Sequence, residues 1–158
     1  MKTAQWLLLL PWLFLFACSP STRFTSSRPA GQTSSSQTRL FRAAENWLGV
    51  PYRWGGNDRQ GIDCSGLAVQ LYRQVFNLKL PRNSARQRQL GYAVHPPYLK
   101  PGALLFFRFK SEEGVEHIGV YLGNGQFIHA SRTRGVVLDR LDDPYYQRHL
   151  IVIRRIVH

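Results

Sequence analysis

The chain has 158 residues, which is enough for one folded domain and not comfortably for two. Hydrophobic residues make up 44% of it, so a packed core can form. Lys and Arg outnumber Asp and Glu by 21 to 9, for a formal net charge of +12, which suggests an anionic environment such as an acidic polymer or membrane surface. The basic residues are scattered, without zinc-finger spacing or an aromatic RNA-binding signature, so nucleic acid is not an expected partner.

Residues 1–17 are predicted to be a signal peptide. The positively charged Lys2 precedes an apolar stretch from Trp6 to Phe16, and the small Ala17 precedes Cys18. This is the pattern of a short export signal rather than of a membrane-spanning helix. The protein is therefore expected outside the cytoplasm.

The run Leu15-Phe16-Ala17-Cys18 resembles the bacterial lipobox, although Phe16 departs from the usual small or aliphatic residue. The resemblance implies that Cys18 is lipidated and becomes the first residue of the mature protein. Ser19 then favours sorting to the periplasmic face of an outer membrane. The alternatives are cleavage by the general signal peptidase, or retention of the segment as a short anchor.

Residues 18–37 follow as a tether rich in Ser, Thr, Pro, Gly and Gln, with little to bury. The folded domain is predicted to span residues 38–158. If Cys18 carries lipid, Cys64 is the only thiol of the mature domain, which favours a catalytic cysteine. A Cys18–Cys64 disulfide is the alternative.

Two helices are predicted in the first half of the domain. The first has an apolar stripe and is stopped by Gly49 and Pro51; its stripe consists of Leu40, Phe41, Ala44, Trp47 and Leu48. The second follows the loop 52–63 and carries Leu67, Leu71, Tyr72, Val75 and Phe76 at helical spacing. A short polar helix capped by Asn83 or Ser84 should then run to Leu90, before a non-helical linker at His95-Pro96-Pro97.

Cys64 is expected in the first turn of the second helix, because Asp63 is a favoured helix-capping residue. Unpaired backbone N–H groups and the helix dipole at this end stabilise a thiolate, which predicts a lowered pKa and a nucleophilic sulfur. The alternative is that Cys64 is a small buried apolar residue.

The second half of the domain reads as short strands. They are expected at residues 103–109, 118–122, 127–130, 136–138 and 150–157. Helices followed by antiparallel strands predict an α+β fold in which the early helices pack on a later sheet.

The strands at 118–122 and 127–130 are joined by Gly123-Asn124-Gly125, which predicts a hairpin. A three-residue loop would pair Leu122 with Gln126, and His117 with Ser131. His129 would then be a diagonal neighbour of His117 on the same face, close enough for the two imidazoles to hydrogen-bond. A two-residue loop would place the two histidines on opposite faces.

A thiol with two neighbouring histidines matches the requirements of nucleophilic catalysis. Cys64 is the predicted nucleophile, His117 the base, and His129 the group that orients the base. Two other readings are open: the histidines are ordinary half-buried polar residues, or all three side chains bind zinc, although their spacing matches no familiar zinc motif.

These features resemble the NlpC family of papain-like bacterial cell-wall peptidases, over about residues 38–157. The resemblance is carried by the segments 51–56 (PYRWGG), 61–67 (GIDCSGL), 80–82 (LPR), 117–121 (HIGVY) and 123–130 (GNGQFIHA). Ala103 departs from the Asp that usually follows Pro-Gly. The resemblance implies a papain-like fold, with helices, one of them carrying Cys64, packed on a central antiparallel sheet.

It also implies a cysteine endopeptidase that cleaves peptidoglycan stem peptides, after D-glutamate or at the crosslink, without cofactor or metal. A monomer is expected because nothing in the sequence requires more. Tyr52, Ser65 and Asp63 match positions on the substrate and oxyanion side. Packing for Tyr52 and a place in the capped first turn for Ser65 are the alternatives. A catalytically silent wall-binding lipoprotein, or an amidase or acyl transferase on the same scaffold, are the competing functions.

Overall fold

The computed structural model describes residues 31–109 and 117–157, with side chains from residue 36 onward. The elements in chain order are α1 (Gly31–Glu45), β1 (Asn57–Asp58), β2 (Gly61–Ile62), α2 (Cys64–Phe76), α3 (Ser84–Gln87), β3 (Tyr92–Val94), the 3-10 helix η1 (Pro96–Tyr98), β4 (Leu104–Phe107), β5 (His117–Gly123), β6 (Gln126–Ser131), β7 (Gly135–Arg140), α4 (Pro144–His149) and β8 (Leu150–Arg155). The predicted signal peptide and Cys18 lie outside the described residues.

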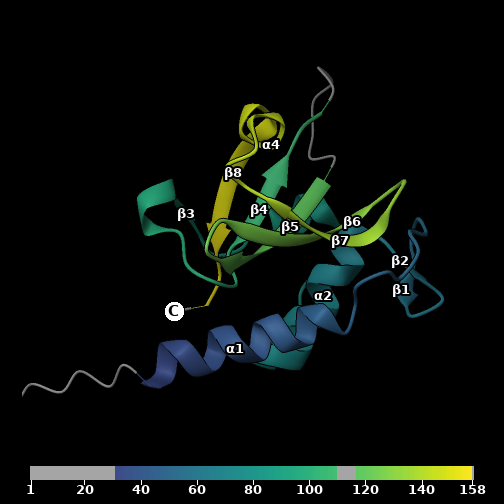
Figure 1. Cartoon of the computed structure of the whole chain (residues 1–158), viewed down its shortest axis with the longest axis horizontal. Helices are drawn as coiled ribbons and strands as arrows, with labels where there is room; N and C mark the ends of the chain where they lie inside the picture. Colours follow the sequence, from purple (N-terminus) through teal and green to yellow (C-terminus); the bar gives the residue numbers. More distant parts are fainter. Residues whose placement is uncertain (1–30, 110–116, 158) are drawn as a thin grey trace, which may run out of the picture.

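An antiparallel sheet of six strands, in the order β3-β8-β4-β5-β6-β7, forms the centre of the domain. The helices α1 and α2 lie together on one side of it, and α4 lies next to β8 at the far end (Figure 1). This arrangement confirms the predicted α+β fold. In the described part of the chain, no helix is long and apolar enough to cross a membrane.

The sheet has a core on each face because the side chains of a strand alternate between faces. In β4, Leu104 and Phe106 pack in the larger core with α1 and α2, whereas Leu105 and Phe107 pack in a smaller core with Tyr146 of α4. All four side chains are fully buried. This double burial explains why β4 reads as a continuous apolar run rather than as an alternating one.

The first helix differs from its prediction at both ends. α1 begins at Gly31, inside the segment assigned to the tether, and the Gln37 side chain donates to the Leu122 carbonyl of β5 at 3.2 Å. Contact with the sheet therefore starts before residue 38. Trp47 is buried as expected, but Leu48 is 42% exposed because the helix ends at Glu45 and a turn follows.

Several short elements were not predicted. β3 pairs with β8, β1 and β2 form a small hairpin inside the 52–63 loop, and the linker at residues 95–97 enters η1 instead of staying irregular. Each has two or three residues, which is too short for a periodic signal. The α4 helix was also missed, although Asp143 caps it and Pro144 occupies its first turn, a recognised start signal.

The hairpin places both histidines on one face, as predicted, but through a different turn. The loop contains only Asn124 and Gly125, both with positive φ, and Gly123 pairs with Gln126. A register shift between Tyr121 and Gly123 then restores the register of the three-residue loop, so that Gly119 pairs with His129. The predicted Leu122–Gln126 pair was wrong, because the extra residue lies in a bulge.

Candidate active site

α2 begins at Cys64, as the sequence predicts, and its first turn is held by Asp63. The Asp63 carboxylate accepts the Gly66 N–H at 2.7 Å and the Gly55 N–H at 2.9 Å. It also accepts from both terminal nitrogens of Arg82, at 2.7 and 3.0 Å. Burial alone would raise the pKa of Asp63, but these hydrogen bonds outweigh it and the pKa lies below its usual value. Asp63 is therefore charged, and it joins the loop to the helix.

Ser65 belongs to the same network. Its hydroxyl lies 3.0 Å from both Asp63 Oδ1 and the Arg82 carbonyl, and it accepts from Arg82 Nη1 at 2.6 Å. The side chain is buried. These contacts favour the structural reading of Ser65, in which it completes the capped first turn.

Gly66 is required here by close approach. A Cβ at this position would lie 2.6 Å from the Gly56 carbonyl oxygen and 2.9 Å from Arg82 Nη2. Any larger residue would push the 52–63 loop away from the start of α2. In the Asp-Cys-Ser-Gly sequence, the Asp therefore caps the helix, the Cys supplies the sulfur, and the Gly lets the loop approach the helix closely.

The Cys64 sulfur lies against the start of β5. The backbone N–H groups of Ile118, the residue after His117, and of Ser65 and Cys64 itself lie close enough to the sulfur to lower the pKa of the thiol. Burial nevertheless raises the pKa of the thiol above its usual value, with the Asp63 charge adding to the effect. The expectation of a lowered pKa was wrong for the site with neutral histidines, because desolvation exceeds the effect of the helix start.

The two histidines are hydrogen-bonded across the hairpin. His117 Nε2 lies 2.7 Å from His129 Nδ1, and the two rings are nearly perpendicular, with 4.8 Å between centroids. His129 is 3% exposed, and its Nε2 lies 2.8 Å from Oδ2 of Asp139 in β7. The three side chains form one line from β5 through β6 to β7.

Asp139 was not predicted as a site residue, and it fixes the protons of this line. A carboxylate accepts only, so His129 Nε2 carries the proton and His129 Nδ1 accepts from His117 Nε2–H. The Nδ1 of His117 is then left unprotonated and able to accept a proton. The predicted strand ended at Leu138, one residue short of Asp139, which is why the sequence did not reveal it.

Asp139 is held by two further donors. Arg134 donates to Oδ1 at 3.1 Å and to Oδ2 at 2.5 Å, and the Tyr146 hydroxyl donates to Oδ2. Burial would raise the pKa of Asp139, but these hydrogen bonds hold it well below its usual range, whereas burial and the Asp139 charge raise the pKa of Tyr146. Asp139 is therefore a permanent anion behind the histidines.

Both imidazoles are neutral in this environment. Burial, followed by the charges of His129 and Arg132, lowers the pKa of His117 to about 3. Burial also lowers the pKa of His129, although Asp139 acts in the opposite direction. The resting site is then a neutral thiol beside neutral imidazoles, and charge appears only when a proton moves.

Two cavities flank this centre. One, of about 240 Å³, is lined by Cys64 and by Tyr52, Trp54, Gly55, Asp63, Ser65, Arg82, Asn83 and Ser84. The other, of about 300 Å³, is lined by His117 and by Phe109, His129, Ser131, Arg132, Thr133, Arg134, Tyr145 and Tyr146. The predicted site residues Cys64, Tyr52, Asp63 and Ser65 therefore share the first cavity, and the two histidines share the second.

Tyr52 and Arg132 connect the two cavities. The Arg132 guanidinium lies close enough to the Tyr52 hydroxyl to lower its pKa, whereas the Asp63 carboxylate, and Cys64 when it is a thiolate, raise it. Burial, the largest effect, and these negative charges raise the pKa of Tyr52. Its hydroxyl therefore keeps its proton and can donate it. Tyr52 also packs against the larger core, so both predicted roles are compatible with its position.

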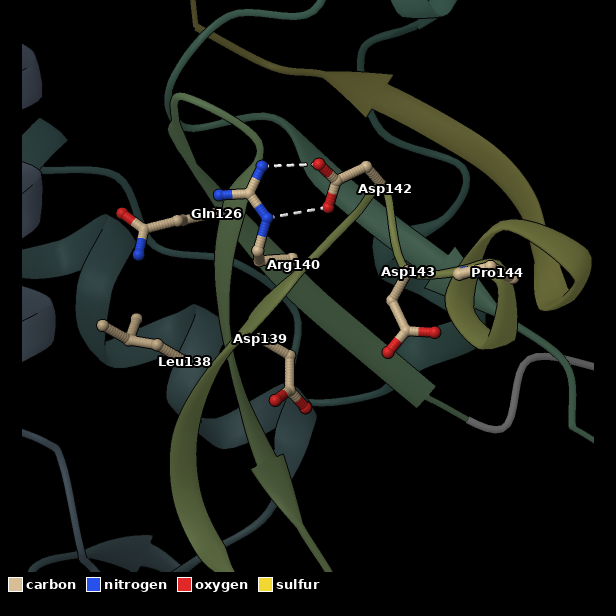
Figure 2. Close-up of a pocket in the computed structure, with 7 residues that line it drawn as sticks. All are labelled: Gln126, Leu138, Asp139, Arg140, Asp142, Asp143 and Pro144. Atoms are coloured by element: carbon tan, nitrogen blue, oxygen red, sulfur yellow. Dashed lines mark hydrogen bonds and ion pairs between the residues drawn. The ribbon is translucent and has the colours of Figure 1, made fainter.

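A third and larger hollow, of about 490 Å³, lies at the other end of β7 (Figure 2). Its lining contains no cysteine or histidine, and its one arginine, Arg140, is paired with Asp142 at 2.5 Å. The Asp139 carboxylate points away from this pair. In the described part of the chain, no cluster of three or more His, Cys, Asp or Glu side chains is arranged to hold a metal ion.

Comparison with known proteins identifies the family of the chain. A sequence model of the NlpC/P60 family matches residues 49–155. The chain is 39% identical over 153 residues to the probable endopeptidase NlpC of Escherichia coli K12, which covers 95% of this chain and 97% of that protein. It is 37% identical over 121 residues to the murein DD-endopeptidase MepS/murein LD-carboxypeptidase of the same organism, 77% of this chain and 63% of that one.

Solved structures give the same result. An NlpC/P60 family protein from Bacillus cereus superposes with a TM-score of 0.70 at 32% identity, over 77% of this chain and 40% of that one. The peptidoglycan hydrolase RipB of Mycobacterium tuberculosis superposes with a TM-score of 0.65 at 28% identity, over 82% of this chain and 69% of that one. By sequence and by fold, the chain belongs to the NlpC/P60 family.

Proposed function

We propose that this protein is a peptidoglycan hydrolase, and specifically a cysteine endopeptidase that cleaves a peptide bond of the stem peptide or its crosslink. The observation that carries the proposal is the hydrogen-bonded line Asp139–His129–His117. The line ends at His117, and the N–H of the next residue, Ile118, acts on the Cys64 sulfur. Relatives named as murein endopeptidases supply the substrate class.

The proposed reaction begins with proton transfer from Cys64 to His117 Nδ1, which the Asp139–His129 line keeps free as an acceptor. The thiolate attacks the carbonyl carbon, and a tetrahedral oxyanion forms. His117 then gives the proton to the leaving amine, and a thioester remains on Cys64. Water, deprotonated by His117, hydrolyses the thioester and restores the thiol.

The Asp139 carboxylate favours the first step. Because neutral His117 has a pKa near 3, an isolated imidazolium would be costly at this buried place. The negative charge of Asp139 raises the pKa of both histidines against burial, so it stabilises the imidazolium in the thiolate–imidazolium pair. In the same pair, the positive charge of the imidazolium offsets the cost of burying the thiolate.

The oxyanion is assigned to donors at the start of α2 and to Tyr52. The N–H groups of Cys64 and Ser65 lie close enough to the sulfur to act on it, and preorganised donors of this kind lower an acyl-transfer barrier by about 3–4 kcal/mol each. Tyr52 adds a hydroxyl whose raised pKa keeps its proton available for donation. Its predicted oxyanion role is therefore retained as part of the proposal.

The proposed location is the bacterial cell envelope, with the chain attached to a membrane through lipid on Cys18 and working as a monomer on the periplasmic face of an outer membrane. The sequence of residues 15–18 supports the anchor. The net charge of +12 is favourable near the carboxylates and phosphates of an envelope.

Mass spectrometry of purified peptidoglycan digested with the full-length protein, compared with Cys64→Ala, tests the proposal. New fragments cut within a stem or crosslink by the wild type alone would support a cysteine endopeptidase. Release of intact stems from muramic acid would indicate an amidase instead. Binding to peptidoglycan without cleavage by either folded protein would sink the enzymatic proposal in favour of a wall-binding lipoprotein.

A further inference from the structure

The cavity on the histidine side has a charge pattern that restricts the substrate, if the proposed function holds. It has a volume of about 300 Å³ and combines an aromatic wall of Phe109, Tyr145 and Tyr146 with the arginines 132 and 134. Phe109 and Tyr145 stack at 5.3 Å between centroids, so the wall is formed by packed rings. Such a cavity fits a short aliphatic residue with an anionic group.

The leaving half of the substrate belongs in this cavity. His117 must deliver its proton to the nitrogen of the broken bond, so the residue bearing that nitrogen has to lie beside His117. The acyl half stays attached to Cys64, which lines the other cavity. The contents of the histidine-side cavity therefore determine which amines can leave.

The two arginines of this cavity are not equivalent. The charge of Arg134 is paired with Asp139, to which Arg134 donates two hydrogen bonds. Arg132 is exposed, and its guanidinium lies near the uncharged hydroxyl of Tyr52. Over the described residues, none of the ion pairs includes Arg132. Its positive charge nevertheless acts on His117, so the guanidinium lies near the reacting atoms.

We propose that Arg132 binds a free carboxylate on the leaving residue, attached to the same carbon as the leaving nitrogen. A carboxylate there lies two bonds from the nitrogen that His117 protonates, and a guanidinium is the side chain best matched to it. The substrates selected are crosslinks made on the side-chain amine of diaminopimelate, whose neighbouring carboxylate is free, or bonds to a C-terminal residue. A bond inside a stem is disfavoured, because there the carboxyl group forms the next peptide bond and carries no charge.

The test uses the full-length protein and two muropeptide dimers. Both are crosslinked through the side-chain amine of diaminopimelate; one has the neighbouring carboxylate free and the other has it as a carboxamide. The variants are Arg132→Gln, which removes the charge and keeps a polar side chain, and Arg132→Lys, which keeps the charge. Arg42→Gln, on the exposed side of α1, is the control for lost net charge.

We expect wild type and Arg42→Gln to cleave the crosslink of the free acid with a kcat/KM about 10- to 100-fold above that of the amide, the range of one hydrogen bond to a charged group. Arg132→Gln should lose this preference because its rate falls much more on the acid than on the amide, and Arg132→Lys should recover part of the preference. Equal wild-type rates on both dimers, cleavage inside the stem, or an equal loss on both dimers in Arg132→Gln would overturn the assignment.

Binding of the two dimers to Cys64→Ala, measured by calorimetry, separates this inference from the proposed function. Tighter binding of the acid that depends on Arg132, without turnover by the wild type, would reject the hydrolase and keep the carboxylate site. Neither turnover nor discrimination in binding would reject both. Discrimination in both measurements would support both.

Discussion

The most informative substitutions are at Asp139, because they test the proton arrangement without touching the sulfur or the base. Oδ2 of Asp139 accepts from His129, Tyr146 and Arg134, and Oδ1 accepts from Arg134 alone. In Asp139→Asn, the amide oxygen can stay at the Oδ2 position and the NH₂ group then faces Arg134. The His129 tautomer is kept, whereas the charge and the hydrogen bond from Arg134 Nη1 are lost.

In Asp139→Leu, His129 Nε2–H loses its carboxylate acceptor and keeps only the Tyr146 hydroxyl at 3.3 Å, and a weakened buried hydrogen bond of this kind costs about 1–3 kcal/mol. Moving the proton to His129 Nδ1 would turn the neighbouring His117 Nε2 into an acceptor. The His117 proton would then lie on Nδ1, where it blocks uptake of the thiol proton. We expect kcat to fall about 10- to 100-fold in Asp139→Asn and about 10²- to 10⁴-fold in Asp139→Leu.

The assay is turnover of a muropeptide dimer by the full-length protein, together with the pH dependence of Cys64 alkylation by iodoacetamide, mapped by mass spectrometry. Both variants should form less thiolate near neutral pH, because the imidazolium loses its nearby anion. Asp142→Asn is the matched control: Asp142 is also paired with an arginine and is exposed, but it faces the hollow of Figure 2. Wild-type kcat in folded Asp139→Leu, or an equal loss in Asp142→Asn, would refute the proposed proton line.

Three further predictions concern the frame of the site. Because burial lowers the pKa of His117 to about 3, the unfolded chain takes up a proton below about pH 6.5 and the folded chain does not. The free energy of unfolding should therefore fall by up to about 1.4 kcal/mol per pH unit as the pH drops from about 6.5 toward 3. An equally steep fall in His117→Gln would contradict this. Gly66→Ala should cost about 1–3 kcal/mol in urea denaturation, since its Cβ would meet the Gly56 carbonyl at 2.6 Å, and a change below about 0.5 kcal/mol would show that the loop adapts freely. Tyr72→Phe removes a fully buried hydroxyl that donates to the Gly102 carbonyl, and should cost about 1–2 kcal/mol by thermal melting while turnover stays unchanged.

The sequence predicted the parts of the site that depend on local rules. Asp63 caps the helix that begins at Cys64, and the hairpin brings His117 and His129 to one face, because capping and the two-residue period of strands are properties of neighbouring residues. The predicted length of the turn was wrong, but the two histidines still lie on one face of the hairpin, because a bulge compensates for the shorter loop.

The sequence did not predict what depends on burial or on distant strands. Asp139 meets His129 only because β7 pairs with β6, and Tyr146 reaches Asp139 from a helix beyond β7. The raised pKa of Cys64 also follows from desolvation, which cannot be read from its place in the first helical turn. Each of these features depends on how the sheet and helices pack in three dimensions.

The strand β5 explains how the two halves of the site are held in register. Ile118 faces the core formed with α1 and α2, and its N–H contacts the sulfur of Cys64. The preceding residue, His117, joins the line of His129 and Asp139, which belongs to the face covered by α4. Nucleophile and base are therefore attached to opposite faces of one sheet and meet through adjacent residues of one strand.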